Sequence, residues 1–86
     1  MDRYFFHIDY GETSRDLEGT VLPNPDAART AAVHLLGEVL RDTADEFWAK
    51  PDVTVTVTDD ADLTLWTLTV AGGEAASVAR ARVRPG

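Results

Sequence analysis

Residues 53–58 read VTVTVT, a run of three β-branched apolar residues that alternate with three threonines. Because side chains point alternately to the two faces of a β-strand, this pattern predicts a strand with a buried valine face and a hydrated threonine face. Residues 59–62 (DDAD) are typical of a turn, and residues 63–70 have the composition of a returning strand. The pattern therefore predicts a β-hairpin over residues 53–70.

A second hairpin is predicted near the start of the chain. Residues 3–10 (RYFFHIDY) are aromatic and β-branched, which favours a strand. Residues 11–16 are polar and typical of a loop, after which residues 17–22 can return antiparallel as a second short strand. Pro23 ends that strand, because proline has no amide proton to donate within a sheet.

The segment between the hairpins predicts one long helix. Asn24 is a favoured N-cap, Pro25 suits the first turn, and residues 25–48 repeat apolar side chains at spacings of three and four. This apolar stripe is expected to face the sheet. Gly37 lies inside the run, where it either allows a neighbouring backbone to approach closely or is simply tolerated. Pro51 stops the helix.

These elements predict an α+β fold in the order strand, strand, helix, strand, strand. We expect a four-stranded, mainly antiparallel sheet with one long helix packed on one face, formed by residues 1–71 as a single domain. Residues 72–86 are expected to be a glycine hinge and an arginine-containing tail; the alanines of the tail favour a helix, and its alternating arginines favour an edge strand. The order of the strands stays open. The expected core residues are Tyr4, Phe6, Ile8, Val21, Leu35, Val39, Leu40, Phe47, Val53, Val55, Val57, Trp66 and Leu68.

Composition narrows the classes of function. The chain has 86 residues, 44% of them apolar and 27% charged, which fits one folded domain rather than a disordered segment. The absence of cysteine excludes disulfides, thiolate metal sites and a cysteine nucleophile. No apolar run approaches the roughly 18–20 residues of a membrane span, and the N-terminus lacks the pattern of a signal peptide. We expect a cytoplasmic protein with no cofactor.

Charge is distributed unevenly along the chain. The net charge is −7, yet residues 1–74 carry all fifteen acidic residues and only five of the eight basic ones. The other three bases are Arg80, Arg82 and Arg84. The acidic body would repel phosphate backbones, and three arginines are few beside the roughly six to ten phosphate contacts of a firm binder. Nucleic-acid contact through these arginines is therefore kept only as an alternative.

Two groups of polar residues could in principle form a catalytic or metal-binding site. His7 and Asp9 share one strand face, which would suit general acid–base work or a metal pair in a hydrolase or nuclease. No second histidine lies near them in sequence and no nucleophile is identifiable, so we interpret His7 as an exposed, partly stacked residue and expect no catalytic residues. Asp59, Asp60 and Asp62 lack the ligand spacing of a calcium loop, and we expect them to be turn residues rather than metal ligands.

A set of short motifs runs along most of the chain. They are RYFFH at residues 3–7, Asp16, Glu18-Gly19, Leu22-Pro23, an alanine-rich helix, a tryptophan after it, and VTD at residues 57–59. Over residues 3–70 they resemble a family of small bacterial proteins that is a domain of unknown function. The resemblance implies a compact stand-alone domain and supplies no activity, cofactor or catalytic residue.

The chain departs from that family in two places. Asp62 stands where the family usually has glycine in the last hairpin turn, and the tail from Ala75 onward lies beyond the usual end. We predict that Asp62 takes a left-handed conformation, which aspartate tolerates better than most residues.

The second face of the sheet is the main candidate for function. Period two places on it a patch made of Phe5, His7, Thr54, Thr56, Leu63 and Leu65. An apolar patch of this kind indicates an interface, most simply a symmetric homodimer that packs sheet on sheet or pairs edge strands. The basic tail can then contact the acidic body of its own chain or of a partner. The leading hypothesis is a small non-enzymatic protein-interaction or regulatory module.

Overall fold

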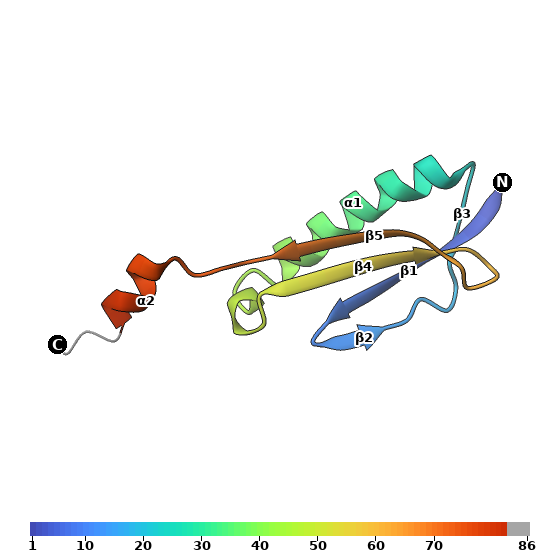
Figure 1. Ribbon diagram of the computed structural model, residues 1–86. Helices are drawn as coiled ribbons and strands as arrows, with labels where there is room; N and C mark the ends of the chain where they lie inside the picture. The colour runs from blue at the N-terminus through green and yellow to red at the C-terminus, as the bar shows by residue number, and fades with distance from the viewer. Residues whose placement is uncertain (83–86) are drawn as a thin grey trace.

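An antiparallel sheet and one long helix form the two layers of the computed structural model, which describes residues 1–82 (Figure 1). The elements are β1 (Asp2–Tyr10), β2 (Glu12–Ser14), β3 (Thr20–Leu22), α1 (Pro25–Asp42), the 3₁₀ helix η1 (Phe47–Ala49), β4 (Asp52–Thr58), β5 (Thr64–Ala71) and α2 (Ala76–Arg82). The α+β class is confirmed. Five strands and two α-helices replace the expected four strands and one helix.

The sheet runs in the order β2-β1-β4-β5, and β3 also pairs with β1. All pairings are antiparallel, so the two hairpins of the sequence meet where β1 lies beside β4. In this order β5 is an edge strand. The centre of the sheet is the β1–β4 pair, in which Phe6 lies opposite Val57 and Ile8 opposite Val55.

The predicted return strand over residues 17–22 is wrong in its boundaries. Residues 12–14 already pair with the end of β1, residues 15–19 form a loop, and pairing resumes at Thr20. The physical reason is Asp16, whose carboxylate accepts a hydrogen bond from the backbone N–H of Phe6 at 3.2 Å. This side chain takes the place of a strand carbonyl, so the return divides into β2 and β3.

Gly19 lets the loop lie directly against β1. Its φ of +71° is in the left-handed region, and a Cβ added there would meet the carbonyl oxygen of Tyr4 at 2.9 Å and the ring of Phe5 at 2.9 Å. A larger residue would have to displace backbone at this point. The Glu18-Gly19 pair in the sequence is therefore a packing requirement of the loop.

The start of α1 follows the prediction. The Asn24 side chain accepts a hydrogen bond from the N–H of Ala27 at 2.8 Å, and Pro25 is the first helical residue. The indole N–H of Trp66, on β5, donates to the carbonyl of Pro25 at 3.0 Å, and the guanidinium of Arg29 lies 4.9 Å from the indole ring centre. These contacts attach the first turn of the helix to the edge strand.

The end of α1 comes earlier than predicted. The helix stops at Asp42, where the hydroxyl and N–H of Thr43 both donate to the carbonyl of Val39, at 2.7 and 3.0 Å. The chain then turns into η1, which buries Phe47 in the core. Burial of this ring through a separate turn is why residues 43–48 do not continue the helix. A Cβ at Gly37 would meet nothing within 4 Å, so this glycine is tolerated rather than required.

The core lies between the valine face of β4 and the alanine stripe of α1. The buried apolar residues are Tyr4, Ala28, Ala32, Leu36, Phe47, Val53, Val55 and Val57. Most of the other expected core residues are partly buried and pack against this cluster. Val21 was expected in the core but is 46% exposed, because β3 is only three residues long and lies at the margin of the sheet. The buried core includes Ala28, Ala32 and Leu36 of α1, which were not among the expected core residues.

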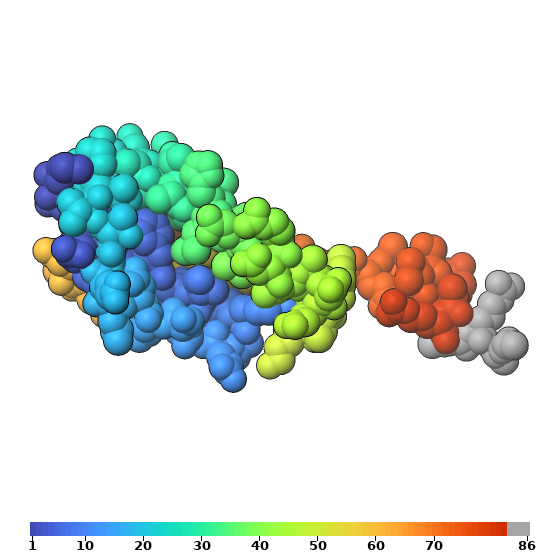
Figure 2. All heavy atoms as spheres, turned by 180° about the vertical axis from the view of Figure 1, so that it is seen from behind, coloured from blue at the N-terminus to red at the C-terminus, as the bar shows by residue number. Residues whose placement is uncertain are grey.

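The chain after β5 leaves the body of the domain. Helix α2 projects beyond the sheet, and every residue in it is exposed (Figures 1 and 2). The molecule measures 60 × 21 × 21 Å, with a Cα radius of gyration of 16.5 Å, whereas a compact chain of this length has a radius of about 12 Å. The helical alternative for the tail is thus confirmed over residues 76–82, and Arg84 lies outside the described residues.

Candidate interaction surfaces

His7 lies on the face of the sheet opposite α1, but the expectation that it is exposed is wrong: the side chain is only 8% exposed, because the loop at residues 15–19 covers it. The N–H of Asp16 donates to its Nδ1 at 3.1 Å, so Nδ1 carries no proton and the neutral ring is protonated at Nε2. Nε2 lies 3.1 Å from the hydroxyl oxygen of Thr58. Both ring nitrogens are therefore engaged in holding loop 15–19 and β4 against β1. Among the described residues, no hydrogen bond joins His7 to Asp9.

The carboxylate of Asp16 is surrounded by backbone amides. It accepts hydrogen bonds from Glu18 at 3.1 Å, Gly19 at 3.0 Å and Phe6 at 3.2 Å. Partial burial opposes ionisation, but these three hydrogen bonds outweigh it and hold the pKa of Asp16 below its ordinary value. The Asp16 side chain is thus the anchor of the loop that covers His7.

The β4–β5 turn forms the acidic end of the sheet. Oδ1 of Asp59 accepts hydrogen bonds from the N–H groups of Ala61 and Leu63, both at 2.9 Å, which makes Asp59 a turn residue. Asp62 has a φ of 64°, so the predicted left-handed conformation is confirmed. Arg15 reaches Asp62 at 3.3 Å across a hollow of about 240 Å³ whose floor includes His7. No group of three His, Cys, Asp or Glu residues within residues 1–82 is arranged to hold a metal ion.

The outer sheet face is more polar than the sequence suggested. Thr54 and Thr56 are half-buried in its middle, and the hydroxyl of Thr54 lies 2.9 Å from that of Thr69 on β5. Leu65 packs against the core cluster, because the β4–β5 pairing is irregular between Val57 and Thr58 and shifts the register beside it. The middle of the face is therefore a threonine surface.

The exposed apolar side chains of this face lie near its acidic end. Phe5 is half-buried beside His7, and Leu63 is 62% exposed at the end of the turn. Leu17, in the loop over His7, is also exposed and was not singled out from the sequence. The structure thus brings Phe5, His7 and loop residues together around one hollow and leaves Leu63 at its margin.

The edge of β5 carries unpaired backbone groups. Gly72 donates its N–H to the carbonyl of Pro51 at 2.7 Å, which defines a hydrogen-bonded pair at the end of the β4–β5 ladder. Because such pairs alternate with non-hydrogen-bonded ones along antiparallel strands, the residues between them point their N–H and C=O groups away from β4. On this pattern Thr67, Thr69 and Ala71 present their backbone groups at the free edge of the sheet.

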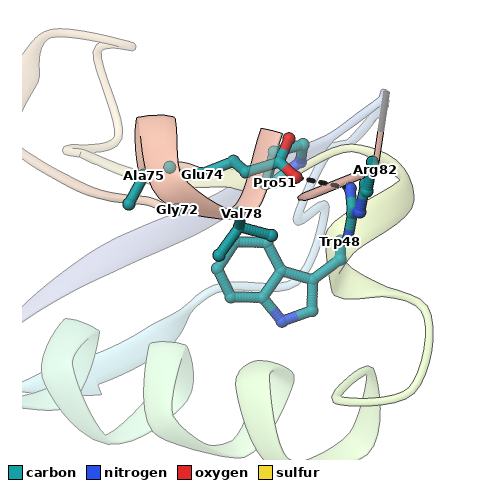
Figure 3. Close-up of a pocket in the computed structure, with 8 residues that line it drawn as sticks. Trp48, Pro51, Gly72, Glu74, Ala75, Val78 and Arg82 are labelled. Carbon is teal, nitrogen blue, oxygen red and sulfur yellow. Dashed lines mark ion pairs between the residues drawn. The ribbon is translucent and has the colours of Figure 1, made fainter. Parts of the chain in front are cut away.

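A second hollow, of about 580 Å³, lies where α2 leaves the body (Figure 3). Its walls include Trp48, which is 65% exposed, and Val78 of α2, and the ion pair between Glu74 and Arg82 closes at 2.7 Å beside them. A Cβ at Gly72 would lie 2.7 Å from the Trp48 ring. In the sequence, the signal for this surface was the tryptophan directly after the helix. The hollow beside it exists because α2 lies next to Trp48.

These features define a small α+β domain in which one helix covers one face of an open antiparallel sheet. The chain belongs to the DUF6894 family: the family model described as a domain of unknown function (DUF6894) matches residues 3–72. The expected resemblance to a domain of unknown function is confirmed, and α2 lies beyond the matched residues. Comparisons with curated proteins and with solved structures found no match. No helix within residues 1–82 has the length and apolar character needed to cross a membrane.

Proposed function

We propose that this domain is a small non-enzymatic protein-interaction module that self-associates by pairing strands at the free edge of β5. The observation that carries the proposal is the edge itself, eight residues (TLWTLTVA) without a charge or a proline. Proteins commonly protect exposed edges with charged residues, proline or very short strands, since an open edge recruits another strand. Of these devices β5 has none, and its irregular pairing is confined to its first residues.

The edge is favoured over the outer sheet face as the contact surface. Sheet-on-sheet packing needs an apolar patch, whereas Thr54, Thr56 and Thr69 occupy the middle of the face. Phe5 and Leu63 remain as an apolar margin that supports the face alternative. That alternative makes a separate prediction: Phe5→Asp would abolish a face-packed dimer and leave an edge-paired dimer intact.

The edge proposal is tested by Thr69→Pro, which removes an outward N–H without removing a β4–β5 hydrogen bond. We expect the solution mass, measured by light scattering after size exclusion, to show a dimer for the natural chain and at least a tenfold weaker dimer for the variant. Thr69→Val is the matched control, because it keeps the N–H. A double variant, Thr67→Lys with Thr69→Lys, repeats the test without proline by placing like charges across the edge.

Two results would overturn the proposal. A natural chain that stays monomeric over the whole concentration range would show that the domain does not self-associate. Equal dimer strength in Thr69→Pro, the double lysine variant and Thr69→Val would show that the dimer does not form through the β5 edge. Circular dichroism establishes for each variant that the fold is retained.

The hydrolase or nuclease alternative centres on His7 and Asp9. The non-enzymatic reading is supported by the engagement of both His7 ring nitrogens in structural hydrogen bonds. Hydrolysis of a generic ester or phosphodiester that disappears in His7→Gln and survives in His34→Gln, a change at an exposed helix position, would favour the enzyme instead. Salt-sensitive binding of nucleic acid that Arg80→Glu abolishes would favour the other alternative.

The same proposal places the module in the bacterial cytoplasm. The motif RYFFH supports a bacterial source through the resemblance it carries, and the lack of cysteine suits a reducing compartment.

A further inference from the structure

We propose that the strand added at β5 is β5 of a second copy of this chain, and that α2 of each copy lies against the acidic β4–β5 turn of the other. This inference rests on the proposed function and adds a second contact to it. Within one chain the two surfaces are far apart: α2 and the β4–β5 turn lie at opposite ends of a molecule 60 Å long (Figure 1).

Antiparallel pairing brings these two ends together. Two identical strands that run in opposite directions place the end of one beside the start of the other. If Thr67 pairs with Thr69 of the second copy, so that both outward-facing positions meet, Gly72 lies opposite Thr64, the first residue of the partner's β5. The segment that follows β5 therefore runs past the partner's turn in a register that pairs most of β5.

The charges of the two segments are complementary. The turn carries Asp59, Asp60 and Asp62, and Arg15 is the base that pairs with one of them. Helix α2 contains Arg80 and Arg82 and no acidic residue. Within residues 1–82, Arg82 pairs with Glu74, and Arg80 has no ion-pair partner. The opposite charges of α2 and the turn favour this antiparallel arrangement, in which Glu74 also approaches the turn but is paired with Arg82 of its own chain.

Helix α2 also lacks enough packing in its own chain. It has seven residues, all exposed, whereas isolated helices shorter than about 12 residues are marginal in water. Its Val78 and the turn residue Leu63 are both exposed apolar side chains, and the proposed arrangement brings them to the same region of the assembly. A second copy would thus supply the surface against which α2 becomes stable.

Charge reversal tests the second contact in the full chain. We expect the Arg80→Glu, Arg82→Glu double variant and the Asp60→Lys variant each to dimerise about tenfold more weakly, with less difference at high salt. A mixture of the two variants should form a heterodimer that is stronger than either variant's own dimer, because the natural helix of one chain then meets the natural turn of the other, and the reversed helix meets a less acidic turn. Arg41→Glu, an exposed change at the end of α1, is the matched control.

Cross-linking tests the geometry independently of affinity. The chain has no cysteine, so Ser77→Cys with Asp60→Cys places one thiol on α2 and one on the turn. A disulfide requires Cα atoms within about 7 Å, which these positions cannot reach within one chain. We expect covalent dimers from the double variant on mild oxidation and none from either single variant.

The results separate the two proposals. Unchanged dimer strength in both charge variants, together with no covalent dimer, would overturn the contact of α2 with the turn while the β5 pairing stands. If the dimer persists in Thr69→Pro and the double cysteine variant is cross-linked, the β5 pairing is contradicted and the contact of α2 with the turn stands. A monomeric natural chain that gives no cross-link would overturn both.

Discussion

At the scale of single residues, Asp62 has a strained backbone conformation that lowers the stability of the turn. Its φ of 64° is unfavourable for a residue with a Cβ, and its ion pair with Arg15 joins two exposed side chains. We expect Asp62→Gly to raise the free energy of unfolding by about 0.5–1 kcal/mol, because glycine adopts this conformation without strain. Urea denaturation checks the result, and an unchanged or lowered midpoint would contradict it.

Asp16 links stability to pH. Its folded pKa is lowered, so its contribution is complete above the unfolded value, near pH 4, and is lost as the pH falls through the folded value. We expect Asp16→Asn to lower the free energy of unfolding at pH 7 by about 1–2 kcal/mol, since the amide cannot accept all three hydrogen bonds. The difference between the two chains should shrink below pH 4.

Urea denaturation at a series of pH values between 7 and 3 measures this difference. Asp45→Asn is the matched control, because Asp45 is exposed and accepts no hydrogen bond from the part of the chain that the structure describes. A difference between Asp16→Asn and the natural chain that stays constant with pH would contradict the role given to the carboxylate.

At the scale of elements, the position of α2 depends on the contact between Gly72 and Trp48. A Cβ at Gly72 would lie 2.7 Å from the Trp48 ring and 3.0 Å from that of Phe47, whereas a Cβ at Gly73 would meet nothing within 4 Å. We expect Gly72→Ala to displace the indole and to speed trypsin cleavage after Arg80 and Arg82 several-fold. Gly73→Ala is the matched control, and equal cleavage of the two variants would contradict the contact.

Local signals explain which elements could be predicted. The valine–threonine alternation of β4 and the Asn24 cap depend on neighbouring residues, so sequence reasoning found both. The boundary between β2 and β3 depends on Asp16 reaching the amide of Phe6, ten residues away. Residue propensities describe only neighbouring residues and cannot predict that contact, so the boundaries of the predicted strand were wrong.

At the scale of the whole molecule, shape and charge are separated along one axis. The acidic β4–β5 turn lies at one end and the basic helix α2 at the other (Figure 1). The uncharged edge of β5 runs between them. The proposed antiparallel pairing uses this layout, because it would satisfy the edge and both charged ends together.

The sequence by itself determined the α+β class, the hairpin at residues 53–70, the start of the helix and the conformation of Asp62. The first three follow from alternation and capping within a few residues, whereas the conformation of Asp62 was predicted from the glycine that the resembling family has at this turn position. Only the tertiary structure decided that His7 is buried beneath a loop, that β5 is the free edge and that α2 leaves the body. These properties depend on which distant segments meet, since burial and strand order are set by packing between elements and not by the residues of one element.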